Sequence, residues 1–212
     1  MEFSASAMIR FGWETFKKRP WFFVQVFVVQ ILLTWAINVV VSIFPQDGVV
    51  SLAGIFVNIA LSVLLSMGVT ALVLKAHDAV ESVTLGALWH PQPFWQYLGA
   101  GIVYALGILA GTILFIIPGI IVLIAYQFGG YIVIDRNFGP IVALQESGRI
   151  TRGNRWELCL LLLLIFGLNL AGMLAVFVGL FVTIPITALA IAHAYRTLEH
   201  RASEVVSGVS NV

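Results

Sequence analysis

Four long stretches of the chain contain no Asp, Glu, Lys or Arg side chain. They cover residues 21–46, 48–74, 90–134 and 158–195. A helix rises about 1.5 Å per residue and must cross about 30 Å of hydrocarbon, so one crossing needs roughly 20 residues. The first two stretches therefore fit one crossing each, and the last two fit two crossings each. The pattern predicts six transmembrane helices, at residues 21–44, 49–74, 94–117, 119–134, 158–176 and 179–196.

Each of the two longest stretches must contain a turn. Pro118 and Gly119 are expected to form the first turn, because proline and glycine both interrupt helices. The second turn is expected between Gly172 and Gly179, and Pro185 predicts a kink within the sixth helix. The fourth helix is short for a full crossing, which predicts a small tilt or a locally thinned bilayer.

An amphipathic segment at residues 4–19 precedes the first predicted crossing. Helical spacing places one set of side chains on an apolar face: Met8, Phe11, Gly12, Thr15 and Phe16. The opposite face carries Arg10, Glu14 and Lys17. The pattern predicts a helix that lies in the cytoplasmic interface of the membrane.

A second amphipathic segment, at residues 140–153, precedes the fifth crossing. Pro140 suits a first helical turn, and Gly153 with Asn154 ends the segment. One predicted face carries Ile141, Leu144, Gly148 and Thr151. The other carries Gln145, Glu146, Arg149 and Arg152. We expect a second interfacial helix here, and a shorter, weaker version at residues 84–89.

The three amphipathic segments are each followed by a tryptophan, at Trp21, Trp95 and Trp156. This order suggests a threefold repeat of amphipathic helix, tryptophan and helical hairpin. The spacing from tryptophan to the next charged residue after the hairpin agrees in the second and third units but is longer in the first. Three unrelated hairpins therefore remain an open alternative.

The basic residues lie on one side of the predicted membrane. All eleven fall in segments on the side of the termini: Arg10, Lys17, Lys18, Arg19, Lys75, Arg136, Arg149, Arg152, Arg155, Arg196 and Arg201. The opposite turns carry only Asp47. By the positive-inside rule we expect both termini in the cytoplasm, a multi-pass protein of the inner membrane, and a cytoplasmic tail at residues 200–212. No cleavable signal pattern precedes the first crossing, so we expect that crossing to stay in the membrane.

Composition agrees with a membrane protein and narrows the classes of function. Of 212 residues, 60% are hydrophobic and 10% are charged, against roughly 45–50% and about 25% in soluble domains. The chain therefore reads as one integral membrane domain, residues 1–212. A net charge of +1 gives no indication of nucleic-acid binding. The single cysteine, Cys159, lies among leucines and cannot form an intramolecular disulfide.

Polar residues recur every four positions along the first two predicted crossings. The first stripe contains Gln30, Thr34, Asn38 and Ser42, and the second contains Asn58, Ser62, Ser66 and Thr70. Polar groups in hydrocarbon seek hydrogen-bond partners, so one interpretation is that the stripes pack together. The other is that this polar seam lines a hydrated path or a groove for a lipid headgroup.

Catalytic and metal-binding patterns are not found in the sequence. No predicted crossing contains a carboxylate, which coupled transporters commonly use. The four histidines, His77, His90, His193 and His200, have no Cys or carboxylate at a spacing that completes a metal site. We therefore expect no catalytic residue, no metal and no cofactor. Gly107 and Gly111 form a GxxxG pair, which is typical of close helix packing.

Two basic clusters lie next to the predicted crossings. The first is Lys17, Lys18 and Arg19, and the second is Arg149, Arg152 and Arg155. They either set the topology alone or bind an anionic phospholipid or a membrane-bound partner, which each cation would favour by about 1 kcal/mol. The partners that we expect are membrane lipids, a membrane protein or a second copy of the chain.

One part of the chain resembles a known group of bacterial membrane proteins. The pattern comprises Pro118-Gly119-Ile120, residues 126–135, and residues 139–154 with Ala143, Leu144, Ser147 and Thr151. It is similar to YciC-like inner-membrane proteins and to the membrane portion attached to some glycerophosphodiester phosphodiesterases. The resemblance covers residues 94–196 and implies a polytopic inner-membrane protein with an interfacial elbow at residues 143–154. It implies no activity, because the chain lacks the length and the ligands of the phosphodiesterase domain.

The sequence therefore predicts an all-α polytopic membrane protein, with six transmembrane helices in three hairpins and cytoplasmic interfacial amphipathic helices. The favoured function is a non-catalytic membrane component that organises lipids or a partner protein. A small permease or channel that uses the polar seam is the first alternative. A membrane-embedded enzyme is the second alternative.

Overall fold

The computed structural model describes residues 4–42, 49–175 and 179–209. In these ranges the chain forms helices and the connections between them, and no strand. The helices are α1 (Ala5–Lys18), α2 (Pro20–Ser42), α3 (Val49–Asp78), η1 (Val80–Ser82), η2 (Leu85–Leu88), α4 (Phe94–Leu114), α5 (Ile116–Tyr126), α6 (Gly129–Arg136), α7 (Pro140–Ile150), α8 (Arg155–Leu174) and α9 (Leu180–Val209).

The predicted all-α membrane fold is confirmed. Six stretches of the described chain are helical, apolar and long enough to cross a bilayer: α2, Leu52–Asp78 in α3, α4, Ile116–Arg136 across α5 and α6, α8, and Leu180–Glu204 in α9. Large apolar side chains such as Trp35, Ile113 and Leu174 are exposed on these helices. A contiguous apolar surface of this extent requires a hydrocarbon environment, so the chain is a multi-pass membrane protein.

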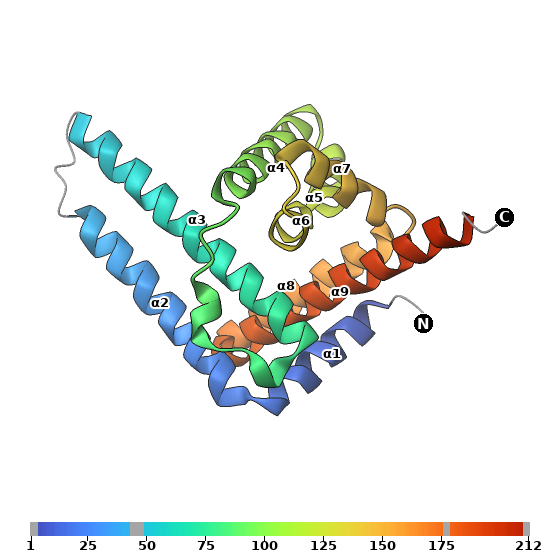
Figure 1. The fold of residues 1–212 in the computed structure, drawn as a ribbon, viewed down its shortest axis with the longest axis horizontal. Helices are drawn as coiled ribbons and strands as arrows, with labels where there is room; N and C mark the ends of the chain where they lie inside the picture. The colour runs from blue at the N-terminus through green and yellow to red at the C-terminus, as the bar shows by residue number, and fades with distance from the viewer. Residues whose placement is uncertain (1–3, 43–48, 176–178, 210–212) are drawn as a thin grey trace.

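The helical hairpins diverge from a shared base. The hairpin of α2 and α3 extends away from the rest of the molecule, and α1 runs beside α9 (Figure 1). Buried apolar side chains form two clusters at the base. One includes Phe128 and Tyr195, and the other includes Leu72 and Leu189. The hairpins are thus held together at the base by these buried clusters. The parts of the hairpins that lie away from the base expose apolar side chains.

The amphipathic segment at residues 4–19 is a helix, and its apolar face packs on protein. A Cβ atom on Gly12 would lie 2.3 Å from the carbonyl oxygen of Ile186, so this glycine lets the backbones of α1 and α9 approach closely. Met8 and Phe16 are buried on the same face. The placement of α1 at the membrane interface stays a prediction.

The turn expected at Pro118 and Gly119 was placed too late in the chain. Helix α4 ends at Leu114, Phe115 is extended, and α5 begins at Ile116. Pro118 falls in the first turn of α5, where the amide hydrogen that proline lacks would have no helical partner. Gly119 instead packs against Thr112, where a Cβ atom would lie 2.3 Å from Oγ1.

The predicted fourth helix, 119–134, is not continuous. Helix α5 ends at Tyr126 and α6 begins at Gly129. The reason is the packing of α7, whose buried face is Ala143, Leu144, Ser147 and Ile150. This face differs from the predicted one, which included Ile141; in the structure Ile141 is exposed.

Other boundaries differ by a few residues or more. The second predicted crossing was expected to end at Leu74, but α3 continues to Asp78. Helix α8 begins at Arg155 rather than Leu158. Helix α9 passes Arg196 and continues to Val209 through the segment expected as a tail, with residues 210–212 outside the described chain. Residues 84–89 contain the short η2 instead of an amphipathic α-helix. The ends of the first and fifth predicted crossings, at 43–44 and 176, and the expected turn residue Asp47 lie outside the described residues.

Candidate functional site

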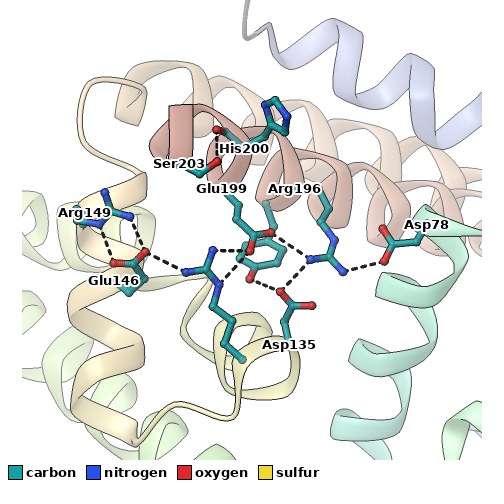
Figure 2. A network of polar contacts seen from close by, with 10 residues as sticks. Asp78, Asp135, Glu146, Arg149, Arg196, Glu199, His200 and Ser203 are labelled. Carbon is teal, nitrogen blue, oxygen red and sulfur yellow. Dashed lines mark hydrogen bonds and ion pairs between the residues drawn. The ribbon is translucent and has the colours of Figure 1, made fainter. Parts of the chain in front are cut away.

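An arginine near the centre of α9 joins the ends of two other helices, α3 and α6. The Arg196 guanidinium donates from Nη2 to Asp78 Oδ2 at the end of α3, over 2.8 Å. It donates from Nη1 to Asp135 Oδ2 on α6, also over 2.8 Å. The same Nη1 reaches Glu199 Oε2, one turn along α9, at 3.1 Å. Figure 2 shows this arginine between the carboxylates.

The network continues to α7 through Arg136. Its Nε donates to Glu199 Oε1 over 3.0 Å, and its Nη1 lies 3.5 Å from Glu146 Oε1. Arg149 in turn donates from Nε and Nη2 to the two oxygens of Glu146, each over 2.7 Å (Figure 2). We call the seven residues the arginine–carboxylate network: Asp78, Asp135, Arg136, Glu146, Arg149, Arg196 and Glu199.

Charges in the arginine–carboxylate network are matched to one another. The hydrogen bond from Arg149 holds the pKa of the Glu146 carboxyl below its usual value, and Glu146 raises the pKa of Arg149. Tyr195 adds a hydrogen bond from its hydroxyl to Asp135 Oδ2, over 3.0 Å. Every carboxylate of the network thus has a donor, which suits a structural clasp better than a general base.

A histidine pair lies beside the arginine–carboxylate network. His77 Nε2 on α3 and His193 Nδ1 on α9 are 2.9 Å apart, so one nitrogen carries a proton that the other accepts. His77 Nδ1 contacts Asp78 Oδ1 at 3.0 Å. The ring of Phe11 on α1 stacks on His193 with centroids 3.8 Å apart. Sequence spacing gave no signal for this pair, because 116 positions separate the two histidines.

A groove of about 620 Å³ borders both the histidine pair and the arginine–carboxylate network. Its lining includes His77, Arg136, His193, Arg196 and His200. No group of three or more His, Cys, Asp or Glu side chains in the described chain could hold a metal ion. The groove is open and its lining residues are polar or charged, and Arg136 and Arg196 among them are engaged with carboxylates.

The break between α5 and α6 is stabilised by side chains from other elements. Ser147 Oγ on α7 donates to Ala125 O over 2.9 Å and accepts from Phe128 N over 3.2 Å. Thr151 Oγ1 also donates to Ala125 O, over 3.1 Å. Ser147 and Thr151 are fully buried. The elbow residues of the sequence pattern thus replace helical hydrogen bonds at the break.

Two further carbonyls at the end of α5 also accept side-chain hydrogen bonds. Tyr104 Oη on α4 donates to Leu123 O over 2.8 Å. Gln127 Nε2 donates to Ile124 O over 3.2 Å. Three successive carbonyls, from Leu123 to Ala125, are therefore occupied by the protein itself.

The structure divides the six residues of the basic clusters into two groups. Arg19 Nη1 donates to the carbonyls of Val80, Glu81 and Val83, at 3.0, 3.1 and 3.0 Å. Arg149 is bound to Glu146, as described above. The other four are exposed and have no ion pair within the described ranges: Lys17, Lys18, Arg152 and Arg155. Lys17 also lies over the ring of Trp13, 5.8 Å from its centroid, and all four cations are accessible to an external anion.

The two polar stripes are not joined by hydrogen bonds within the described chain. Asn38 Nδ2 donates to Thr34 O of its own helix, over 2.7 Å. Ser62 Oγ lies 3.5 Å from Asn58 Oδ1, also within one helix. Ser66 Oγ instead meets Tyr97 Oη of α4, at 2.8 Å. Thr34, Asn38, Ser62 and Ser66 are exposed, and Gln30 and Asn58 are half-buried.

Comparison with known proteins finds distant relatives. The chain is 27% identical over 161 residues to the uncharacterized protein Rv2560 of Mycobacterium tuberculosis, and equally to the uncharacterized protein Mb2590 of Mycobacterium bovis. The alignment covers 76% of this chain and 49% of each relative, so the chain spans about half the length of these proteins. No family profile and no solved structure matches the chain. The comparisons thus place related sequences in mycobacteria.

Proposed function

We propose that the chain is a non-catalytic protein of the bacterial inner membrane, which gathers anionic lipids or a membrane-bound partner at its cytoplasmic face. The observation that carries this proposal is the pairing of exposed cations with exposed tryptophans. Lys17 and Lys18 precede Trp21, which is 79% exposed, and Arg152 and Arg155 precede Trp156, which is 72% exposed. Tryptophan favours the headgroup region, where such cations attract anionic lipids.

The arginine–carboxylate network supports the cytoplasmic placement of both termini. It joins the ends of α3 and α6 to α9. These are ends that the positive-inside rule assigns to the same side as the termini. The mycobacterial relatives and the resemblance to YciC-like proteins support a bacterial inner membrane, since both concern bacterial sequences.

The test measures which lipids accompany the purified full chain. The wild type, extracted with its native lipids, is expected to be enriched in anionic phospholipid over the bulk membrane. A variant with Lys17→Gln, Lys18→Gln, Arg152→Gln and Arg155→Gln should lose this enrichment, because each cation contributes about 1 kcal/mol of attraction. Arg10→Gln is the matched control, since Arg10 already faces Glu14 at 3.9 Å. Equal anionic lipid content in the fourfold variant and the wild type would overturn the proposal.

A small permease or channel is the second candidate, and the break between α5 and α6 is the feature that suggests it. Interrupted helices bind substrates and ions in many transporters. Here, however, the carbonyls at the break are occupied by side chains, which weighs against ion binding there. Reconstituted vesicles test this candidate. If the polar seam conducts, replacing Asn38 and Asn58 together with leucine should abolish flux without unfolding the chain.

An enzyme is the least supported candidate. The carboxylates beside the groove are held by arginines, and the described chain offers no metal site. A nucleophile with an adjacent free base is not found among these residues, so we assign no reaction.

A further inference from the structure

The connection between α3 and α4 folds back along α3 and is fixed there. A Cβ atom on Gly68 would lie 1.9 Å from the carbonyl oxygen of Leu88, so the backbone of η2 rests directly on α3. The three hydrogen bonds from Arg19 hold the preceding residues of the connection. The connection is therefore held at two places. Its η2 turn rests on α3, and its first residues are bound by Arg19, which directly follows α1.

Two hollows flank η2. An apolar groove of about 370 Å³ lies between α2, α3 and η2, and its lining includes Leu33, Leu61, Leu64, Leu65 and Leu88. Its volume is within the range of ligand pockets, about 300–1,000 Å³. Trp89 and His90 also line the apolar groove, and Trp89 is 74% exposed. We expect this tryptophan to mark the level of the lipid headgroups.

A polar hollow of about 380 Å³ lies on the other side of η2. Lys75, Asp78, Ser82, Thr84 and Gly86 are among its lining residues. Leu85 and Leu88 of η2 face the apolar groove, whereas Gly86 and Ala87 face the polar hollow. A single short turn thus separates a hydrocarbon-like surface from a polar one.

The uncompensated charge of the polar hollow is positive. Lys75 is exposed and has no ion pair among the described residues. The acid of the hollow, Asp78, is already bonded to His77 and Arg196. Burial and the charge of Lys75 lower the pKa of His90, so His90 stays a neutral hydrogen-bonding group at neutral pH. Lys75 is therefore available to an anion, close to the histidine that lines the apolar groove.

We propose that these two hollows bind one anionic phospholipid. An acyl chain occupies the apolar groove, and the phosphate accepts hydrogen bonds from Lys75 and from the hydroxyl of Thr84. The inference rests on the proposed function, because it requires the chain to sit in a bilayer. It goes further by naming one saturable site, formed by α2, α3 and η2, apart from the two basic clusters.

Lipid titration of the delipidated full chain, followed by native mass spectrometry, tests the site. The probes are phosphatidylglycerol and phosphatidylcholine with identical acyl chains. We expect one tightly bound phosphatidylglycerol, and a weakening of about fivefold in Lys75→Gln, which corresponds to about 1 kcal/mol for one cation. Arg10→Gln is the control, since Arg10 is an exposed cation on α1 that faces Glu14 and lines neither hollow. Equal binding of the two lipids, or no effect of Lys75→Gln, would overturn the proposal.

A second pair of measurements tests the acyl chain. Leu64→Trp fills the apolar groove and should block the tight phosphatidylglycerol, whereas Leu163→Trp, on the exposed surface of α8, should not. Circular dichroism confirms that both variants fold. Glycerol 1-phosphate, which has a headgroup and no chain, should fail to compete. Competition by glycerol 1-phosphate would show a site for phosphate alone and would contradict the proposal. A dimer of the chain in place of bound lipid would show that a second copy fills the apolar groove, which would also contradict it.

Failure of this site is distinguishable from failure of the proposed function. The fourfold variant of Lys17, Lys18, Arg152 and Arg155 should lose bulk enrichment and keep the single site. Lys75→Gln should keep bulk enrichment and weaken the single site.

Discussion

Arg196 on α9 and Asp78 at the end of α3 are 118 positions apart in the chain and share a hydrogen bond of 2.8 Å. Through this pair, the last apolar helix is tied to the end of the second. The same guanidinium also holds Asp135 on α6. One side chain therefore fixes the relative positions of all three hairpins at their shared base, which makes it the first residue to test.

Replacing Arg196 with glutamine should destabilise the protein by about 2–3 kcal/mol, because it removes charge-assisted hydrogen bonds and leaves carboxylates without their donor. Thermal unfolding in detergent measures the change. Arg149→Gln is the control, since the Arg149 side chain is about half exposed and its pair with Glu146 should contribute less than about 1 kcal/mol. Equal losses in both variants would contradict a central role for Arg196.

Ser147→Ala should loosen the break between α5 and α6. The substitution removes the acceptor of Phe128 N and one donor to Ala125 O, at an expected loss of about 1–3 kcal/mol. Hydrogen exchange of the Phe128 amide should accelerate with it. Ser203→Ala is the control, because Ser203 is exposed and its hydrogen bond is to the carbonyl of His200 in its own helix. An unchanged exchange rate at Phe128 would mean that the break is held by other contacts.

Gly12→Ala should separate α1 from α9. The added methyl group would meet the backbone of Ile186, which cannot move aside as a flexible side chain could, so we expect a loss of about 1–3 kcal/mol. Gly101→Ala is the matched control, since no atom lies within 4 Å of the position of its Cβ. Thermal unfolding and limited proteolysis near residue 19 would detect the difference. Equal stability of the two variants would contradict the close approach of α1 and α9.

The pair of Glu146 and Arg149 predicts a pH dependence with a definite sign. Because the pKa of Glu146 is lower in the folded protein than its ordinary value of 4.5, its contribution to stability is complete above that pH. The contribution is lost as the pH falls through the lower, folded value. The difference in unfolding temperature between wild type and Glu146→Gln should thus be constant from pH 7 to about 5 and shrink in more acidic solution. A difference that grows on acidification would show the opposite sign.

The helices of membrane length could be predicted from the sequence because each depends on a local property, a charge-free apolar run. The turn at Phe115 could not be placed, because Pro118 fits both the end of one helix and the first turn of the next. The break at Gln127 and Phe128 depends on Ser147 and Thr151, which are 19 to 26 positions away. Only their packing makes the interruption stable.

Candidate site residues were predictable only where a single segment decides their environment. Lys17, Lys18, Arg152 and Arg155 are exposed, as expected for cations beside a helix end. The roles of Arg19 and Arg149 were not foreseeable, because their acceptors are set by how the chain folds back. The arginine–carboxylate network and the pairing of His77 with His193 require α3, α6 and α9 to meet. No periodic pattern in the sequence indicates that these three helices contact one another.

The packing of α1 along α9 has a consequence for biogenesis. During synthesis α1 leaves the ribosome before the six apolar helices, and its partner α9 follows all the others described here. The surface that buries Met8, Gly12 and Phe16 is therefore incomplete until α9 has been synthesised. A nascent chain arrested before α9 would leave the apolar side of α1 without the helix on which it packs, so the docking of α1 depends on the synthesis of α9.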